Sequence, residues 1–174
     1  MTHYIFTKLL GWKLEGAFDP AIKKSVIIVV PHTSWHDFYL GVLIRSIIKI
    51  PIDFIGKKEL FRWPFGAYFR WMGGTPIDRS EGQNKVEAIA QIFAEKEEFR
   101  LSLAPEGTRK KVLNWKTGFY YIALAAEVPI IPVSFDYERK VVKIGQAFYP
   151  TGDYEKDSRL LQLFFKGVKG KADL

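Results

Sequence analysis

The chain has 174 residues, of which 48% are hydrophobic and 26% charged, and its formal net charge is +7. This length predicts a single domain over residues 1–174 with its own hydrophobic core, and the composition excludes a disordered or fibrous chain. Because the sequence contains no cysteine, disulfides, thiolate metal sites and cysteine nucleophiles are excluded as well.

The N-terminal segment, residues 2–14, predicts a short amphipathic helix with Ile5, Leu9 and Trp12 on one side. Such a helix either lies flat on a bilayer surface or packs on the domain, and the sequence leaves both interpretations open. Lys8 and Lys13 interrupt its apolar residues, so no signal peptide is predicted and the protein is expected to stay in the cytoplasm.

The remaining chain alternates between strands and helices. Residues 25–31 are a continuous β-branched run, which is typical of a strand buried on both faces of a parallel sheet. Further strands are predicted over 53–56, 75–77, 100–104, 130–137 and 140–144, and helices over 35–49, 81–98, 115–127 and 153–168. This order favours the α/β class: a single mixed, mostly parallel sheet with helices on both faces, in which the late hairpin adds the antiparallel pair.

No segment is predicted to span a membrane. The longest apolar stretch, residues 119–135, contains Glu127 and is broken by Pro129 and Pro132, whereas a spanning helix needs about 20 apolar residues. Residues 54–72 have another character, because their aromatic side chains stand among Lys57, Lys58, Arg62 and Arg70. This mixture suits an anionic membrane surface, so a peripheral attachment to the cytoplasmic face of a membrane is expected. Nucleic acid is not a predicted partner, since no nucleic-acid signature accompanies the basic residues.

Residues 31–37 (PHTSWHD) follow the first long strand and open a helix, which is where reaction sites of open α/β sheets lie. On an ideal helix His32 and Asp37 would point about 140° apart. If His32 instead lies in the turn before the helix and Asp37 in its first turn, the carboxylate reaches back to the imidazole. Asp37 would then fix the imidazole tautomer and leave the other ring nitrogen free as a general base.

Two other interpretations of this stretch stay open. Ser34 and Asp37 resemble a capping box, with Ser34 as the N-cap of the helix and no catalytic role for the carboxylate. Alternatively, His32, His36 and Asp37 have the residue types of a metal site. The chain has only three histidines and no further ligand is evident elsewhere, so no metal is predicted.

Cationic residues follow two further predicted strands. Arg79 ends the stretch 73–79 (GGTPIDR), and Arg109 and Lys110 lie in the stretch 104–111 (APEGTRKK). Because parallel strands end at one edge of a sheet, these cations are expected to converge with His32, where arginine offers a planar fork of donors for a phosphate.

Together, these motifs resemble a known family. The pattern His32-x4-Asp37, the stretch 73–79, the sequence PEGTR at 105–109 and the sequence VPIIPV at 128–133 are similar, in order and spacing, to the four motifs of the glycerolipid acyltransferases, which include the 1-acylglycerol-3-phosphate acyltransferases. Pro76, Ala104 and Lys110 depart from that pattern, which bears on the acceptor more than on the chemistry.

The resemblance implies transfer of a fatty acyl group from a thioester, carried by coenzyme A or acyl carrier protein, to a hydroxyl of a lysophospholipid or glycerol-phosphate-type acceptor. No bound cofactor is implied. His32 would be the general base and Asp37 its partner, and Pro132 with Ile131 would shape the acyl-binding region. The polar head of the acceptor would be held by Arg79, Glu106, Gly107, Thr108, Arg109 and Lys110.

Two alternatives to this activity stay open. The same base would acylate a lyso-aminolipid, which lacks the phosphate. A different class of function, a non-enzymatic basic module that binds anionic lipid, is also compatible with the net charge. A covalent acyl-enzyme is disfavoured, because the chain has neither a G-x-S-x-G sequence nor a cysteine.

Overall fold

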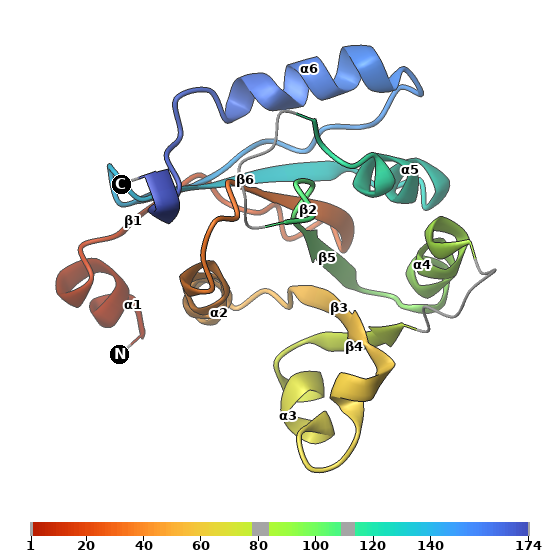
Figure 1. The fold of residues 1–174 in the computed structure, drawn as a ribbon, viewed down its shortest axis with the longest axis horizontal. Coiled ribbons are helices and arrows are strands. Elements are labelled where there is room, and N and C mark those ends of the chain that lie inside the picture. Colours follow the sequence, from red (N-terminus) through yellow and green to blue (C-terminus); the bar gives the residue numbers. More distant parts are fainter. Residues whose placement is uncertain (1, 78–83, 109–113, 174) are drawn as a thin grey trace.

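The computed structural model describes residues 2–77, 84–108 and 114–173. A seven-stranded sheet with the order β1-β7-β6-β2-β5-β3-β4 runs through these residues (Figure 1). Neighbouring strands are parallel except β6 and β7, which form the predicted antiparallel hairpin. The expected single mixed, mostly parallel sheet is therefore confirmed. The strands are β1 (Lys13–Glu15), β2 (Lys24–Val30), β3 (Asp53–Lys57), β4 (Gly74–Ile77), β5 (Phe99–Leu103), β6 (Ile130–Asp136) and β7 (Val141–Ile144).

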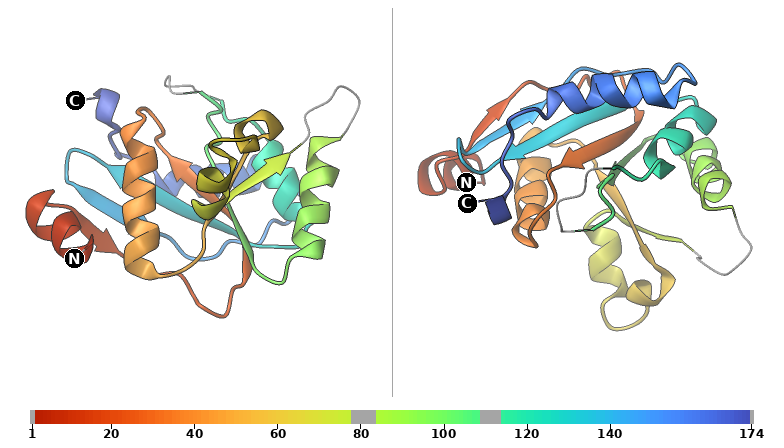
Figure 2. Two further views of the ribbon diagram at one scale, coloured as in Figure 1. Left: turned by 90° about the horizontal axis from the view of Figure 1, so that it is seen from below. Right: turned by 45° about the horizontal axis from the view of Figure 1, so that its top comes forward.

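Helices cover both faces of the sheet, as predicted (Figures 1 and 2). The helices are α1 (Thr2–Tyr4), α2 (His36–Ile48), α3 (Gly66–Trp71), α4 (Lys85–Glu95), α5 (Gly118–Ala125) and α6 (Tyr154–Phe164), with the further helical turns η1 (Ile5–Leu9), η2 (Lys58–Phe61) and η3 (Lys171–Asp173). In the described ranges, none of these helices is long and apolar enough to pass through a bilayer.

The prediction of a helix through residue 14 was wrong in its second half. Helical structure stops after Leu9, the chain turns at Gly11 with φ +70°, and β1 then pairs in parallel with β7. Phe6 and Trp12 are buried in the domain core, so these two rings pack on the sheet. Strand β1 has only three residues, and they contain no apolar run. For this reason the sequence predicted no strand here.

Two hydrophobic clusters lie on opposite faces of the sheet. Along β2 the side chains alternate: Val26 and Ile28 join the cluster beneath α4, α5 and α6, whereas Ile27 joins the one beneath α2 and the N-terminal turns. The continuous β-branched run of β2 therefore follows from burial on both faces.

The strands β2, β3 and β5 run in parallel, so their carboxyl ends meet at one edge of the sheet. Three segments begin there: the loop 31–35 before α2, the excursion 58–71 between β3 and β4, and the turn 104–108 after β5. Figure 2 (left) shows the start of α2 and helix α3 on this same side of the molecule. This edge is where the candidate site lies.

Candidate active site

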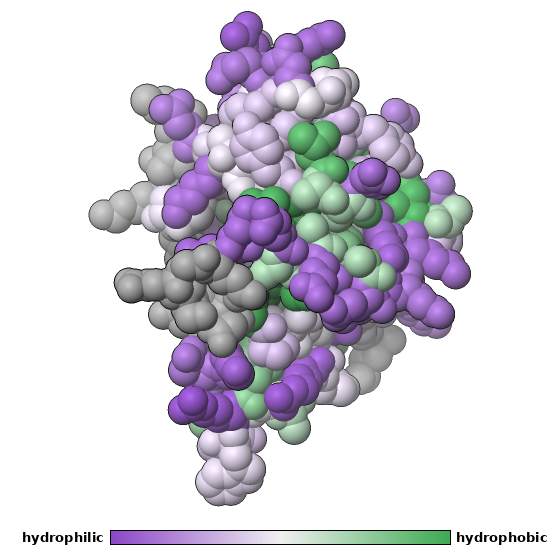
Figure 3. All heavy atoms as spheres, turned by 90° about the vertical axis from the view of Figure 1, so that its right-hand side faces the viewer, coloured by the Kyte–Doolittle hydropathy of each residue, from purple (hydrophilic) through white to green (hydrophobic). Residues whose placement is uncertain are grey.

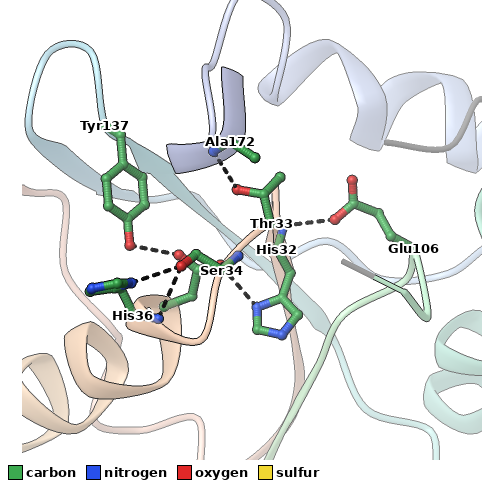
Figure 4. Close-up of polar contacts among 8 residues, drawn as sticks. His32, Thr33, Ser34, His36, Glu106, Tyr137 and Ala172 are labelled. Atoms are coloured by element: carbon green, nitrogen blue, oxygen red, sulfur yellow. Dashed lines mark hydrogen bonds and ion pairs between the residues drawn. The ribbon is translucent and has the colours of Figure 1, made fainter. Parts of the chain in front are cut away.

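His32 and Asp37 meet at the carboxyl end of β2. His32 lies in the loop before the helix and Asp37 in the first turn of α2, which is the arrangement that lets the carboxylate reach back. The imidazole Nδ1 lies 3.2 Å from Asp37 Oδ2, with the Asp37 side chain 1% exposed and that of His32 29% exposed (Figure 4). A buried carboxylate thus contacts an imidazole that solvent or a substrate can still reach.

Three groups lie within hydrogen-bond distance of the Asp37 carboxylate. Besides His32, the Ser34 backbone N–H donates to Oδ2 at 2.9 Å and the Tyr137 hydroxyl donates to Oδ1 at 2.6 Å. Burial on its own would raise the pKa of Asp37, but these hydrogen bonds hold the pKa below its ordinary value. Asp37 is therefore a carboxylate at neutral pH, with one oxygen directed to the imidazole.

Tyr137 completes this network from the end of β6. Its pKa lies well above the usual range, because burial and the Asp37 carboxylate both favour the protonated phenol. The ring packs edge-on against Trp12 at a centroid distance of 4.9 Å. Sequence reasoning missed Tyr137, because it lies 100 positions from Asp37 and no motif contains it.

The capping interpretation and the catalytic interpretation both involve the same atom, Asp37 Oδ2. Asp37 Oδ2 accepts the Ser34 N–H, as the acidic member of a capping box does, and also contacts His32. The predicted capping contacts of Ser34 are present, because its hydroxyl also accepts the His36 N–H at 3.3 Å. The helix itself begins one residue later than this prediction implies, at His36 with Trp35 as the N-cap. The Ser34 hydroxyl lies 2.8 Å from His36 Nδ1 as well.

Glu106 approaches the same loop from the turn after β5. Its carboxylate is buried, and Oε2 accepts a hydrogen bond from the His32 backbone N–H at 2.7 Å (Figure 4). Burial raises the pKa of Glu106 above its ordinary value, and the hydrogen bond from His32 offsets part of that effect. The contact ties the turn after β5 to the loop before α2. The stretch 104–111 was expected at this edge of the sheet, but this hydrogen bond was not predicted.

The other residues expected to bind the acceptor divide into two groups. Gly107 and Thr108 are exposed in the turn beside Glu106, with Gly107 at φ +61°. Arg79, Arg109 and Lys110 lie outside the described residues.

A cavity of about 260 Å³ opens beside the imidazole and extends between α2 and the sheet. His32 and Asp37 form part of its wall, and most of the remaining wall is apolar. The wall also includes Phe18, Ile27, Val29, Phe38, Gly41, Val42, Ile44, Arg45, Ile52, Asp53, Phe54, Met72, Ser102, Leu103, Ala104, Val133 and Phe135. An elongated apolar ligand can therefore lie with one end at the imidazole.

Gly41 leaves room in this cavity. A Cβ atom at this position would meet nothing within 4 Å, although the residue sits in the middle of α2. Sequence analysis gave no role to Gly41, because an isolated glycine in a helix carries no indication of what it faces. Ile131 and Pro132, expected in the acyl-binding region, do not line the cavity, whereas Val133 and Phe135 of the same strand do.

Within residues 2–77, 84–108 and 114–173, no group of three His, Asp or Glu side chains is placed to hold a metal ion. His36, which the metal interpretation needs, is turned toward Ser34, and its ring lies tilted against Trp35 at a centroid distance of 3.9 Å. Nothing in the described geometry brings His32, His36 and Asp37 together as ligands.

Comparison with known structures identifies a likeness of fold. The crystal structure of the 1-acyl-sn-glycerophosphate (LPA) acyltransferase PlsC from Thermotoga maritima superposes with a TM-score of 0.58 at 21% sequence identity. The superposition covers 97% of this chain and 78% of that protein. At this identity the likeness concerns the arrangement of strands and helices.

Curated proteins extend the likeness from the fold to the amino-acid sequence. The 1-acyl-sn-glycerol-3-phosphate acyltransferase of Escherichia coli strain K12 is 34% identical over 133 residues, which is 72% of this chain and 53% of that protein. The protein of the same name from Cocos nucifera is 34% identical over 113 residues, 62% of this chain and 36% of its own. The chain thus spans about half the length, or less, of these curated relatives. A family profile described as Acyltransferase matches residues 14–136, which include the His32–Asp37 pair and Glu106, and the chain therefore belongs to the Acyltransferase family.

Proposed function

We propose that this protein transfers an acyl group from an acyl thioester to a hydroxyl of a lysolipid of the 1-acylglycerol-3-phosphate type. One observation carries the proposal: a buried carboxylate lies 3.2 Å from the imidazole of His32 at the opening of a cavity of about 260 Å³ with largely apolar walls. An acyl chain fits such a cavity, and its thioester carbonyl would then lie beside the base. The names of the relatives from Escherichia coli and Cocos nucifera support this acceptor.

In the proposed mechanism His32 acts as a general base. Its Nδ1–H donates to Asp37, so Nε2 is the free basic nitrogen. Nε2 takes the proton of the acceptor hydroxyl as that oxygen attacks the thioester carbon, and Asp37 stabilises the imidazolium that forms. When the tetrahedral intermediate collapses, the C–S bond breaks and the imidazolium returns its proton to the thiolate. An ester and a free thiol leave, and His32 is neutral again.

Two carboxylates serve this mechanism in different ways. Asp37 orients the imidazole ring, whereas Glu106 holds the backbone of His32 and thereby fixes where the ring begins. We assign the acceptor phosphate to Arg79, Arg109 and Lys110, which follow β4 and the Glu106 turn in the sequence. Gly107 and Thr108 would border the polar head from the same turn.

The substrates define where the reaction takes place. A lysolipid is held in a membrane, and the acyl thioester is carried to it by coenzyme A or acyl carrier protein. We therefore place the protein at the cytoplasmic face of a membrane, bound peripherally to anionic lipid. The choice between the two carriers is decided by the experiment below.

The test is product analysis by mass spectrometry. The protein is incubated with palmitoyl-coenzyme A or palmitoyl-acyl carrier protein and, in separate reactions, 1-acylglycerol-3-phosphate, glycerol-3-phosphate, lysophosphatidylethanolamine and a lyso-aminolipid. We expect a diacyl product from 1-acylglycerol-3-phosphate that depends on His32. Acylation of the lyso-aminolipid alone would overturn the phosphate assignment, and no acylated product with any acceptor or carrier would overturn the proposed activity.

A further inference from the structure

The segment 58–71, here called the aromatic lobe, consists of η2, α3 and the turn between them. It exposes large apolar side chains to an unusual degree: Trp63 is 94% exposed, Trp71 76% and Phe65 65%. Leu60 and Tyr68 are exposed beside them. Large aromatic side chains are normally covered in a folded chain, and a group of them left in solvent marks an interaction surface.

The exposure follows from how the lobe is built. Phe61 is buried, and its ring occupies a socket in which a Cβ at Gly56 or Gly74 would come within 2.9 Å or 2.7 Å of it. Gly66 lies against the Phe61 carbonyl, where a Cβ would come within 2.0 Å. With Phe61 directed inward and the backbone fixed around it, the neighbouring Trp63 is directed outward. The lobe is therefore a defined element that presents aromatic rings.

The charges around these rings have one predominant sign. Residues 58–71 contain Lys58, Arg62 and Arg70 against the single acid Glu59, a net charge of +2 from three cations and one anion. All four side chains are exposed. An anionic lipid surface favours this composition, because aromatic rings sit at the level of the headgroups and cations meet the negative charge beside them.

The lobe lies at the edge of the sheet that carries His32. It leaves the carboxyl end of β3, just as the catalytic loop leaves that of β2. It projects from the body of the domain in Figure 1, and the lower end of the space-filling view in Figure 3 narrows to a tip in pale colours, as expected for Trp and Tyr. Trp35 and Tyr39, at the start of α2 on the same edge, are also exposed.

We propose that the aromatic lobe is a membrane-docking element that inserts Trp63, Phe65 and Trp71 into the headgroup region of an anionic bilayer. Docking by this edge brings the opening of the cavity to the lipid surface, from which a lysolipid can reach His32 without crossing water. The choice of a bilayer as the partner rests on the proposed function. The exposed rings and the positive charge of the lobe do not depend on it.

The test compares two triple variants of the full chain in co-sedimentation with vesicles. The lobe variant carries Trp63→Ala, Phe65→Ala and Trp71→Ala. The matched control carries Tyr149→Ala, Leu160→Ala and Leu163→Ala, which remove three exposed apolar side chains on or near α6, on the opposite side of the molecule. Vesicles of phosphatidylcholine with one third phosphatidylglycerol are compared with pure phosphatidylcholine.

We expect the unmodified chain to bind the anionic vesicles more tightly than vesicles of pure phosphatidylcholine. The affinity of the lobe variant for the anionic vesicles should be lower by a factor on the order of ten or more. The α6 control should bind like the unmodified chain. Equal binding by the lobe variant overturns the proposal. A loss of self-association in size-exclusion chromatography, with unchanged vesicle binding, overturns it in favour of an interface between copies.

An assay with dispersed substrates separates this proposal from the proposed function. Short-chain acyl thioester and short-chain lysolipid, both below the concentration at which they aggregate, require no docking. The lobe variant should turn these over at the unmodified rate and lose activity only toward lysolipid embedded in vesicles. If no chain turns over any substrate while the lobe still governs vesicle binding, the proposed activity fails and the docking surface stands.

Discussion

The catalytic loop, residues 31–37, and the aromatic lobe, residues 58–71, begin at equivalent places in the fold. Each leaves the carboxyl end of a parallel strand at the same edge of the sheet. The catalytic loop turns its polar groups inward, where Asp37 is buried and fully engaged in hydrogen bonds. The lobe turns Phe61 inward, with Phe69 packed on it, and leaves Trp63, Phe65, Tyr68 and Trp71 exposed.

This difference shows how one sheet edge can hold two kinds of surface. A buried carboxylate is tolerable only because donors surround it, so the catalytic loop must be rigid and polar inside. The lobe is held in place mainly by the buried ring of Phe61. Its exposed side chains are therefore available to contact a partner. In our account the first region carries the chemistry and the second brings the molecule to its substrate. The predictions below separate these roles.

Replacing the base should have the largest effect. In His32→Ala the hydroxyl of the acceptor loses its proton acceptor, and we expect turnover to fall by roughly 10²- to 10⁴-fold. Initial rates of acyl transfer to dispersed substrate measure this, with thermal unfolding as the check on folding. The matched control is His3→Ala, an exposed histidine on α1. Unchanged turnover in folded His32→Ala would remove His32 from the mechanism.

Tyr137→Phe should have a smaller effect. It removes the hydroxyl that donates to Asp37 Oδ1 at 2.6 Å and keeps the ring that packs on Trp12. A hydrogen bond to a charged group is worth about 1.5–3 kcal/mol, of which part should appear in kcat, so we expect kcat to fall by about tenfold with little change in KM. The pKa of Asp37 should rise, because a hydrogen bond that lowers it is lost.

The pH profile distinguishes this positioning role from a merely structural one. Without the Tyr137 donor, the Asp37 carboxylate should hold a proton on the His32–Asp37 pair more strongly, so the activity of Tyr137→Phe should be lost at a higher pH on acidification than that of the unmodified chain. Tyr121→Phe, an exposed tyrosine on α5, serves as the control and should leave the profile in place. A uniform decrease at every pH would contradict the positioning role.

Gly41→Leu should change which acyl chains are accepted. The new side chain enters the cavity where a Cβ meets no neighbour, so it takes up space that we assign to the acyl chain. Each methylene displaced should cost about 0.8 kcal/mol, a factor of about four in kcat/KM, for the longest acyl chains. Competition between acyl thioesters of different length measures the shift. The matched control is Gly118→Leu, because a Cβ at Gly118 also meets no neighbour but the residue does not line the cavity. The same chain-length preference in both variants would refute the assignment of this space to the acyl chain.

The two buried carboxylates should affect stability with opposite signs. Asp37 has a lowered pKa, so its contribution to the free energy of unfolding is present at neutral pH and is lost as the pH falls through the folded-state value. Glu106 has a raised pKa, so its contribution is present at low pH and is lost as the pH rises through the folded-state value.

Urea unfolding of Asp37→Asn and Glu106→Gln at pH 7 and pH 4 measures this difference. We expect Asp37→Asn to lower the free energy of unfolding at pH 7 by about 1–2 kcal/mol, and less at pH 4. Glu106→Gln keeps an oxygen that can accept the His32 N–H, so it should not destabilise the protein at pH 7. A larger loss for Glu106→Gln than for Asp37→Asn at pH 7 would contradict the assigned signs.

The main features of the fold could be predicted from local patterns. The β-branched run of β2 and the alternation of strands with helices were enough to indicate a mixed α/β sheet, because burial on both faces dictates those residues. The edge strand β1 was missed, since backbone pairing with β7 defines it and its side chains do not. The prediction of a helix over residues 2–14 was wrong in its second half for the same reason, because pairing with β7 makes residues 13–15 a strand.

The site could be predicted only where its contacts are local. Asp37 and His32 are five positions apart, and the spacing with a helix start between them predicted the contact. Tyr137 follows a distant strand and was not predicted, because no motif contains it. Glu106 was expected at the same edge of the sheet, but as part of the acceptor site, and its hydrogen bond with the His32 N–H was not predicted. Similarly, the sequence showed aromatic residues in 58–71 but could not tell the buried Phe61 from the exposed Trp63, because the socket for the Phe61 ring is formed at Gly56 and Gly74, which lie outside this segment.

The central claim is that Asp37 holds the His32 imidazole with its proton on Nδ1, which leaves Nε2 as the base. Nitrogen-15 NMR of the imidazole groups at neutral pH tests this directly, and the three histidines of the chain can be assigned by comparison with His32→Ala and His3→Ala. We predict for His32 a protonated Nδ1 and an unprotonated Nε2, and in Asp37→Asn a loss of this preference. A proton on Nε2 and none on Nδ1 in the unmodified protein would contradict the account.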